Sequence, residues 1–168
     1  MSTPSTGSHT GSSAGIQAAS QPRSGACHCG ALVIELVTAR APAALPVRTC
    51  GCTFCRKHRP RYTSDPAGHV TIRCAVEATL ARYRFGLRLA DFLICRTCGV
   101  FVAAYEPGEP GRAVINLEVL ACAAELVAAP VAFTGYDGED VAARTARRAA
   151  NWTPATLVIG DRSEPRAI

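Results

Sequence analysis

The chain has 168 residues, 48% of them hydrophobic, and a formal net charge of +5, so it fits one domain with enough apolar content to build a core. Its longest apolar stretch, 117–133, is interrupted by Glu118, Glu125 and Pro130 and is too short to span a bilayer, so we expect a soluble protein. The positive charge is modest and comes from scattered arginines, which is a weak argument for a nucleic-acid partner.

Residues 1–24 are predicted to form a flexible tail, because Ser, Thr, Gly and Ala dominate them and Ile16 is their one large aliphatic residue. Such a segment buries too little apolar surface to offset its ordering entropy. It has neither the basic start nor the apolar stretch of a secretory signal, so we expect a cytoplasmic protein. The expected zinc-binding domain covers residues 25–160, followed by a C-terminal tail over residues 161–168.

Short runs of β-branched and aliphatic residues, separated by Pro and Gly, predict a mainly β domain. The predicted strands cover residues 31–38, 47–50, 69–74, 79–85, 90–95, 100–105 and 113–117. A helix is predicted at 138–150, with Asp137 as its N-cap, Glu139 and Asp140 near its positive end and arginines near its negative end. The residues at 119–128 allow a second short helix, so we expect one or two C-terminal helices.

Seven of the nine cysteines fall into three tight clusters that come at the ends of predicted strands. Thiolates one or two residues apart, with small residues between or after them, suit a soft tetrahedral metal such as zinc. The clusters are Cys27-His28-Cys29-Gly30, Cys50-Gly51-Cys52-Thr53-Phe54-Cys55 and Cys95-Arg96-Thr97-Cys98-Gly99.

Disulfides and redox-active dithiols are the alternatives to metal binding. In a reducing cytosol, clustered cysteines are more often metal ligands, and an odd total of nine fits poorly with complete pairing. Cysteines separated by one residue also make strained disulfide rings. Cys74 and Cys122 stand alone in apolar surroundings, where a buried small hydrophobic residue is expected rather than a ligand.

Seven ligands divide into a set of four and a set of three. The first and third clusters each supply two sulfurs followed by a glycine, so together they predict a closed structural zinc site. The middle cluster supplies three sulfurs within six residues and leaves one position open, which is the arrangement of a catalytic zinc. The four structural ligands are therefore Cys27, Cys29, Cys95 and Cys98, and the three catalytic ligands are Cys50, Cys52 and Cys55.

A divalent ion with three thiolates has a net charge of −1, so it is better suited to hold an exchangeable fourth sulfur than to make hydroxide. Arg56 and Lys57 directly follow the open cluster and could balance the added charge or bind ligand carboxylates; a solvated loop is the alternative. His58 is either a proton acceptor near the open site or a surface histidine. The side chain of His28 is expected to point away from its neighbouring cysteines.

The same residues resemble a known family, the glutathione-dependent formaldehyde-activating enzymes, whose domain is shared with centromere protein V. The resemblance covers about residues 24–120 and, more loosely, Tyr136-Asp137-Gly138 and Asn151-Trp152. Its motifs are Gly25-Ala26-Cys27-His28-Cys29-Gly30-Ala31, Cys50-x-Cys52-x-x-Cys55-Arg56, Tyr83-Arg84-Phe85-Gly86, Cys95-Arg96-Thr97-Cys98-Gly99 and Val114-Ile115-Asn116-Leu117.

The resemblance implies a zinc-bound sheet fold like the Mss4-type β-tent, with two zinc ions divided between the ligand sets given above. It also implies a carbon–sulfur lyase that joins a small thiol such as glutathione to formaldehyde, or catalyses the reverse. The alternative is a zinc-stabilised binding module for nucleic acid or another macromolecule. Against that alternative, aromatic residues make up 6% of the chain and no dense basic tail is present. A redox role for the middle cluster is the third hypothesis.

Overall fold

The computed structural model describes residues 21–126 and 131–160, which form one branched β-sheet with two short α-helices. The strands are β1 Gln21–Ala26, β2 Leu32–Thr38, β3 Val47–Cys50, β4 Tyr62–Thr63, β5 His69–Cys74, β6 Leu80–Tyr83, β7 Asp91–Cys95, β8 Phe101–Glu106, β9 Gly111–Asn116, β10 Val131–Thr134 and β11 Thr153–Ile159. The helices are α1 Thr53–His58 and α2 Val141–Asn151. Single 3₁₀ turns cover Pro42–Ala44, Glu77–Thr79, Leu117–Val119 and Ala123–Leu126.

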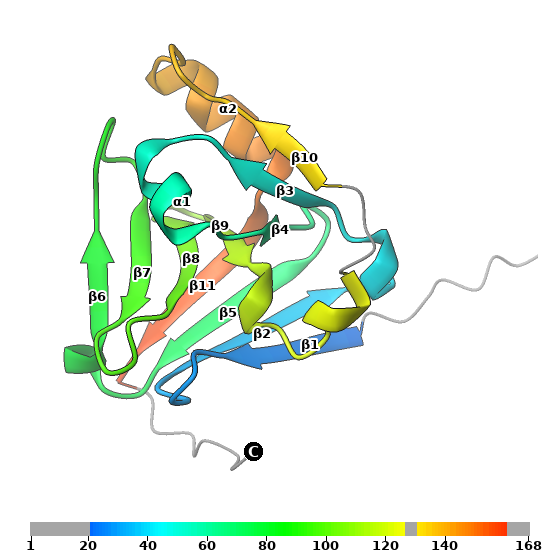
Figure 1. The fold of residues 1–168 in the computed structure, drawn as a ribbon, viewed down its shortest axis with the longest axis vertical. Coiled ribbons are helices and arrows are strands. Elements are labelled where there is room, and N and C mark those ends of the chain that lie inside the picture. Colours follow the sequence, from blue (N-terminus) through cyan, green and yellow to red (C-terminus); the bar gives the residue numbers. More distant parts are fainter. Residues whose placement is uncertain (1–20, 127–130, 161–168) are drawn as a thin grey trace, which may run out of the picture.

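The sheet branches at β9, which pairs with β8 along one edge and with both β11 and β4 along the other. One arm has the order β1-β2-β5-β11, a second is β6-β7-β8, and a third is β4-β3-β10. Figure 1 shows the three arms splayed around a common interior, with β6, β7 and β8 facing the sheet formed by β2, β5 and β11. The mainly β class predicted from the sequence is confirmed.

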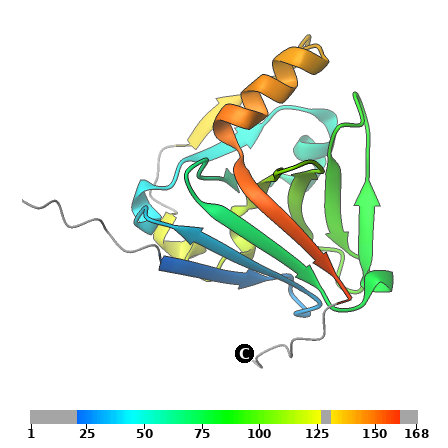
Figure 2. The same cartoon turned by 180° about the vertical axis from the view of Figure 1, so that it is seen from behind.

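In the first arm, β11 lies between β5 and β9. It runs parallel to β5 over residues 155–159 and antiparallel to β9 over residues 153–155. α2 leads directly into β11 and extends beyond the sheet, as seen from behind in Figure 2. β11 therefore joins two strands that precede it by many residues.

The interior contains two adjoining groups of buried side chains. The larger one holds the alternate, inward-facing residues of β2 and β5, together with Leu93 and Val102 from the facing arm and Ile115 from β9. Their packing follows from the period of two along each strand, which puts every second side chain on the same face. The smaller group is aromatic and surrounds the middle cysteine cluster; its buried members are Phe54, Cys55, Tyr62, Ala90, Phe101, Ala104, Val114 and Trp152.

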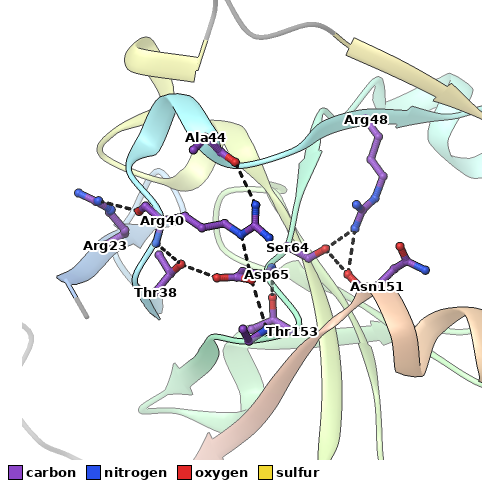
Figure 3. Close-up of polar contacts among 10 residues, drawn as sticks. Arg23, Thr38, Arg40, Ala44, Arg48, Ser64, Asp65, Asn151 and Thr153 are labelled. Atoms are coloured by element: carbon purple, nitrogen blue, oxygen red, sulfur yellow. Dashed lines mark hydrogen bonds and ion pairs between the residues drawn. The ribbon is translucent and has the colours of Figure 1, made fainter. Parts of the chain in front are cut away.

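A buried carboxylate ties the first arm to the loop after β4. The side chain of Asp65 accepts hydrogen bonds from the Thr38 hydroxyl at 2.6 Å and from Arg40 Nε at 3.2 Å, and its backbone N–H donates to Thr153 Oγ1 at 2.8 Å (Figure 3). Burial raises the pKa of Asp65, but the hydrogen bonds that its carboxylate accepts, first of all from Thr38, hold this pKa below its usual range. The network fixes the loop that carries Ser64, whose hydroxyl accepts a hydrogen bond from Arg48 in the lining of the cavity described below.

Several predicted elements differ from the observed ones. Residues 21–24, expected to be part of the tail, form β1 together with 25–26 and pair with β2. The N-cap of α2 is Asp140, whose side chain accepts a hydrogen bond from Ala143 N–H at 2.8 Å, so the expected cap at Asp137 is wrong. Of the helix considered at 119–128, residues 123–126 form a 3₁₀ turn and residues 127–128 lie outside the described residues.

No helix within residues 21–126 and 131–160 has the length and apolar character needed to cross a membrane.

Candidate metal sites and the adjoining cavity

The first and third cysteine clusters form two similar turns that meet at one end of the sheet. Cys27 and Cys29 lie in the turn between β1 and β2, and Cys95 and Cys98 lie at the turn between β7 and β8. Each turn is closed by a glycine with positive φ, Gly30 at 78° and Gly99 at 75°, a conformation that costs glycine little. These tight turns bring the two sulfurs of each pair close together.

The four sulfurs of these turns lie within 4.8 Å of one another. Cys29 Sγ is 3.7 Å from Cys27 Sγ and 3.5 Å from Cys95 Sγ. Four sulfurs at about 2.3 Å from a tetrahedral zinc would be roughly 3.8 Å apart, so the observed spacing fits such an ion. Leu32 N–H also donates to Cys27 Sγ at 3.3 Å, which is the kind of backbone contact that stabilises a thiolate ligand.

The sulfurs of the middle cluster also lie within 4.8 Å of one another, and each is placed by a different local feature. Cys50 ends β3, and Cys52 is the N-cap of α1, where its sulfur accepts a hydrogen bond from Cys55 N–H at 3.4 Å. Cys55 is buried in α1, and its sulfur lies 3.1 Å from the hydroxyl of buried Tyr62. The end of β3, the N-cap of α1 and the interior of α1 thus each place one sulfur in the same small region.

Two thiols of this cluster, Cys50 and Cys55, differ in how readily they lose a proton. Hydrogen bonding to Cys55 lowers the pKa of Cys50 to about 6, even though burial opposes ionisation. The pKa of Cys55 is raised by its hydrogen bond with Cys50 and by burial. In the four-sulfur group, burial raises the pKa of Cys27 to about 12. A bound cation would stabilise all the sulfurs of a group as thiolates at once, so these differences in protonation would disappear.

The middle cluster forms part of the wall of a cavity of about 450 Å³. Apolar and aromatic side chains from the β6–β7 loop, β7 and the end of α2 form another part, including Phe85, Phe92 and Trp152. A volume of this size suits a small organic ligand rather than a single water molecule. The three sulfurs consequently face a space that a ligand can enter.

Arginines contribute much of the polar lining. Arg144 and Arg147 of α2 both bind the carboxylate of Glu139, and the hydrogen bond from Arg147 lowers the pKa of Glu139 to about 2. The guanidinium of Arg147 also stacks 3.5 Å from the centre of the Tyr136 ring. Arg48 of β3 lies among these groups, and burial lowers its pKa. The cavity therefore joins a sulfur cluster to a positively charged wall.

The structure brings all seven predicted cysteine ligands into the two predicted groups, each of which could hold a metal ion. Arg56 and Lys57 are exposed on α1 and do not line the cavity, so their predicted contact with substrate remains a prediction. His28 is exposed, as expected, while His58 stacks on Phe54 with 4.2 Å between ring centres.

The two isolated cysteines lie outside both groups, as predicted. Cys74 is buried and donates its S–H to the Val76 carbonyl at 3.1 Å, and Cys122 packs against the larger core. Sequence reasoning did not identify Tyr62 or Arg48. Arg48 lies on the predicted strand 47–50, whereas Tyr62 lies outside every predicted strand, and the pairing of β3 with β4 was needed to place both residues.

No protein-family model matches the chain. A structural-genomics crystal structure of a Rhodobacter sphaeroides protein is similar to it, with a TM-score of 0.51 and 29% sequence identity. The match covers 66% of this chain and 99% of that one. This similarity indicates a common fold over the matched part.

Proposed function

We propose that this chain is a zinc-dependent carbon–sulfur lyase of the glutathione-dependent formaldehyde-activating type, with a fold of the Mss4-like β-tent kind. It would add a small thiol to formaldehyde or a related aldehyde, or catalyse the reverse. The observation that carries the proposal is the three-sulfur cluster in the wall of a ligand-sized cavity, separate from a complete four-sulfur group. A closed set and an open set of sulfurs are the respective marks of structural and catalytic zinc.

The donor sets support zinc in both places. Every candidate ligand is a cysteine sulfur, and thiolates select zinc over hard cations such as magnesium or calcium. Cys27, Cys29, Cys95 and Cys98 would hold the structural ion, and Cys50, Cys52 and Cys55 the catalytic one. Bound in the open site, zinc would favour the thiolate form of a fourth, exchangeable sulfur.

Side chains around the open site would position a ligand sulfur and limit the access of water. The Tyr62 hydroxyl fixes the position of the Cys55 sulfur, and the aromatic wall restricts water around the reacting groups. In the addition, the thiol sulfur forms a bond to the aldehyde carbon while the carbonyl π bond breaks, and the thiol proton ends on the former carbonyl oxygen. Since thiols add to formaldehyde without help, the main contribution expected from the protein is to hold both reactants together.

The test is the rate at which formaldehyde and glutathione equilibrate, measured with and without the zinc-loaded protein at equal total zinc. The C52S variant serves as a matched control, because it keeps the four-sulfur group and removes one sulfur from the open set. We expect acceleration by the unaltered protein and none by C52S. If the unaltered protein accelerates neither glutathione nor a panel of other small thiols, the proposed reaction is wrong.

A further inference from the structure

Arg48 is a half-buried cation in the cavity whose guanidinium has no carboxylate partner within the described part of the chain. Its Nη2 donates to the hydroxyl of Ser64 and lies 3.5 Å from the carbonyl oxygen of Asn151 (Figure 3). Both acceptors are neutral, and both contacts use the same nitrogen. The rest of the guanidinium fork is left for another acceptor.

The other arginines of the cavity lining either pair with a carboxylate or are exposed to solvent. Arg144 and Arg147 share the carboxylate of Glu139, and Arg148 donates to Glu106 at 2.8 Å. Arg88, in the β6–β7 loop, is exposed. Arg48 is therefore the partly desolvated cation of this lining that lacks an anion, and a buried charge without a partner is unfavourable.

Arg48 lies on the same face of β3 as one cysteine of the sulfur cluster. Arg48 and Cys50 are two residues apart in β3, so their side chains leave the same face of the strand, and both line the cavity. Both side chains therefore reach one cavity from the same strand, and a small molecule in that cavity can contact the guanidinium and the sulfurs together. Across the ladder, Arg48 pairs with Tyr62, which binds Cys55.

We propose that Arg48 binds the carboxylate of a small thiol whose sulfur is directed at Cys50, Cys52 and Cys55. The inference rests on the proposed function and deepens it, because it defines the ligand as an anionic mercapto acid and names the residue that selects it. A guanidinium matches the two oxygens of a carboxylate, and the pairing compensates the charge of Arg48. In the competing account, Arg48 only offsets the negative charge of the sulfur cluster, and then neutral and anionic thiols bind equally well.

Two thiols of similar length separate these accounts: mercaptopropionate, which carries a carboxylate, and mercaptopropanol, which carries a hydroxyl. Their binding to the zinc-loaded protein is measured by calorimetry, without any aldehyde. We expect the unaltered protein to bind the carboxylate form about tenfold more tightly, as a charge-assisted pair of hydrogen bonds allows. In R48Q this preference is lost while mercaptopropanol binds as before.

R59Q is the matched control, because it removes the same charge from an exposed arginine outside the cavity lining. It is expected to keep the full preference. Equal binding of the two thiols by the unaltered protein, or an undiminished preference in R48Q, overturns the role of Arg48 and leaves the lyase proposal standing. Failure of both thiols to bind the unaltered protein instead contradicts the proposed function.

If R48Q no longer binds mercaptopropanol either, the substitution has disrupted the site. In that case, competition by acetate is measured on the unaltered protein instead. Acetate supplies the carboxylate without the sulfur, so it is expected to weaken the binding of mercaptopropionate to the unaltered protein and to leave mercaptopropanol unaffected. Equal effects on the two thiols would overturn the inference.

Discussion

The Tyr62 hydroxyl lies 3.1 Å from the Cys55 sulfur, and both side chains are buried. When Cys55 is a thiolate ligand, its sulfur can only accept, so the hydroxyl is the donor. Such a contact has two effects: it holds the sulfur in position and withdraws some of its negative charge. A group of this kind supports a metal ligand without touching the metal.

Replacing Tyr62 by Phe should weaken metal binding in the open site about 10- to 100-fold, the usual cost of removing a hydrogen bond to a ligand. The ring and its packing against Phe101 remain, so the fold should be retained. Competition with a chromophoric chelator measures the affinity, and the d–d spectrum of a cobalt-substituted sample reports the ligand geometry. Y105F, which removes the hydroxyl of a tyrosine of β8 that does not line the cavity, is the control. An unchanged affinity in Y62F would show that the contact is incidental.

At the scale of elements, the strands that flank the cysteine clusters could be predicted because their apolar and polar residues alternate. β2, β3 and β5 have the predicted bounds within one residue, and β7, β8 and β9 start or end within two residues of theirs. β1 and β11 contain Pro22 and Pro154, residues that local rules place outside strands. β1 nevertheless pairs with the neighbouring β2, and β11 pairs with β5 and β9, which lie far from it in the sequence. α1 has six residues, too few to show a helical period.

The same distinction applies to the candidate sites. The cysteine groups could be predicted, because short spacing within each cluster limits how the sulfurs can be used. Arg48 could not, because its surroundings come from three separate segments: Ser64 after β4, Asn151 at the end of α2, and the cluster itself. Glu139 lies near the positive end of the helix, as predicted, but the ion pairs of its carboxylate with Arg144 and Arg147 could not be predicted from its position alone.

The ion pairs of Glu139 predict an acid response confined to α2. The pKa of this carboxyl is lowered from 4.5 to about 2, first of all by the hydrogen bond from Arg147. A lowered pKa means that the contribution to stability is present above about pH 4.5 and is lost as the pH falls toward about 2. Hydrogen exchange of the α2 amides should therefore be slower in the unaltered protein than in E139Q near neutral pH, and the difference should vanish in acid.

E77Q, which changes an exposed glutamate on a distant turn, is the control for that comparison. A difference between the unaltered protein and E139Q that persisted to the lowest pH would mean that size or shape, rather than the charge of Glu139, stabilises α2.

For the whole molecule, the two sulfur groups differ in what they connect. The four-sulfur group joins the β1–β2 turn to the β7–β8 turn, which belong to different arms of the sheet. The three-sulfur group is local, since it lies within six consecutive residues at the end of β3 and the start of α1. A metal that connects distant arms contributes its binding free energy to folding, whereas a local one contributes far less to the overall fold.

C98S should therefore lose cooperative unfolding or become insoluble, because it removes a ligand from the group that joins the arms. C52S should keep its fold and bind about one zinc ion fewer per chain. Thermal unfolding and the metal content of each purified variant test this difference. If C52S unfolds as readily as C98S, the middle cluster has a structural role and the case for an open zinc site fails.

The position of β11 between β5 and β9 has a consequence for the order in which the chain can fold during synthesis. The other strands described above precede β11 in the sequence and leave the ribosome first, so for that interval β5 and β9 each expose an edge of unpaired backbone groups. Such edges readily pair with other chains. The nascent chain is thus most vulnerable to misassociation just before β11 appears, when most of the described core has already been made.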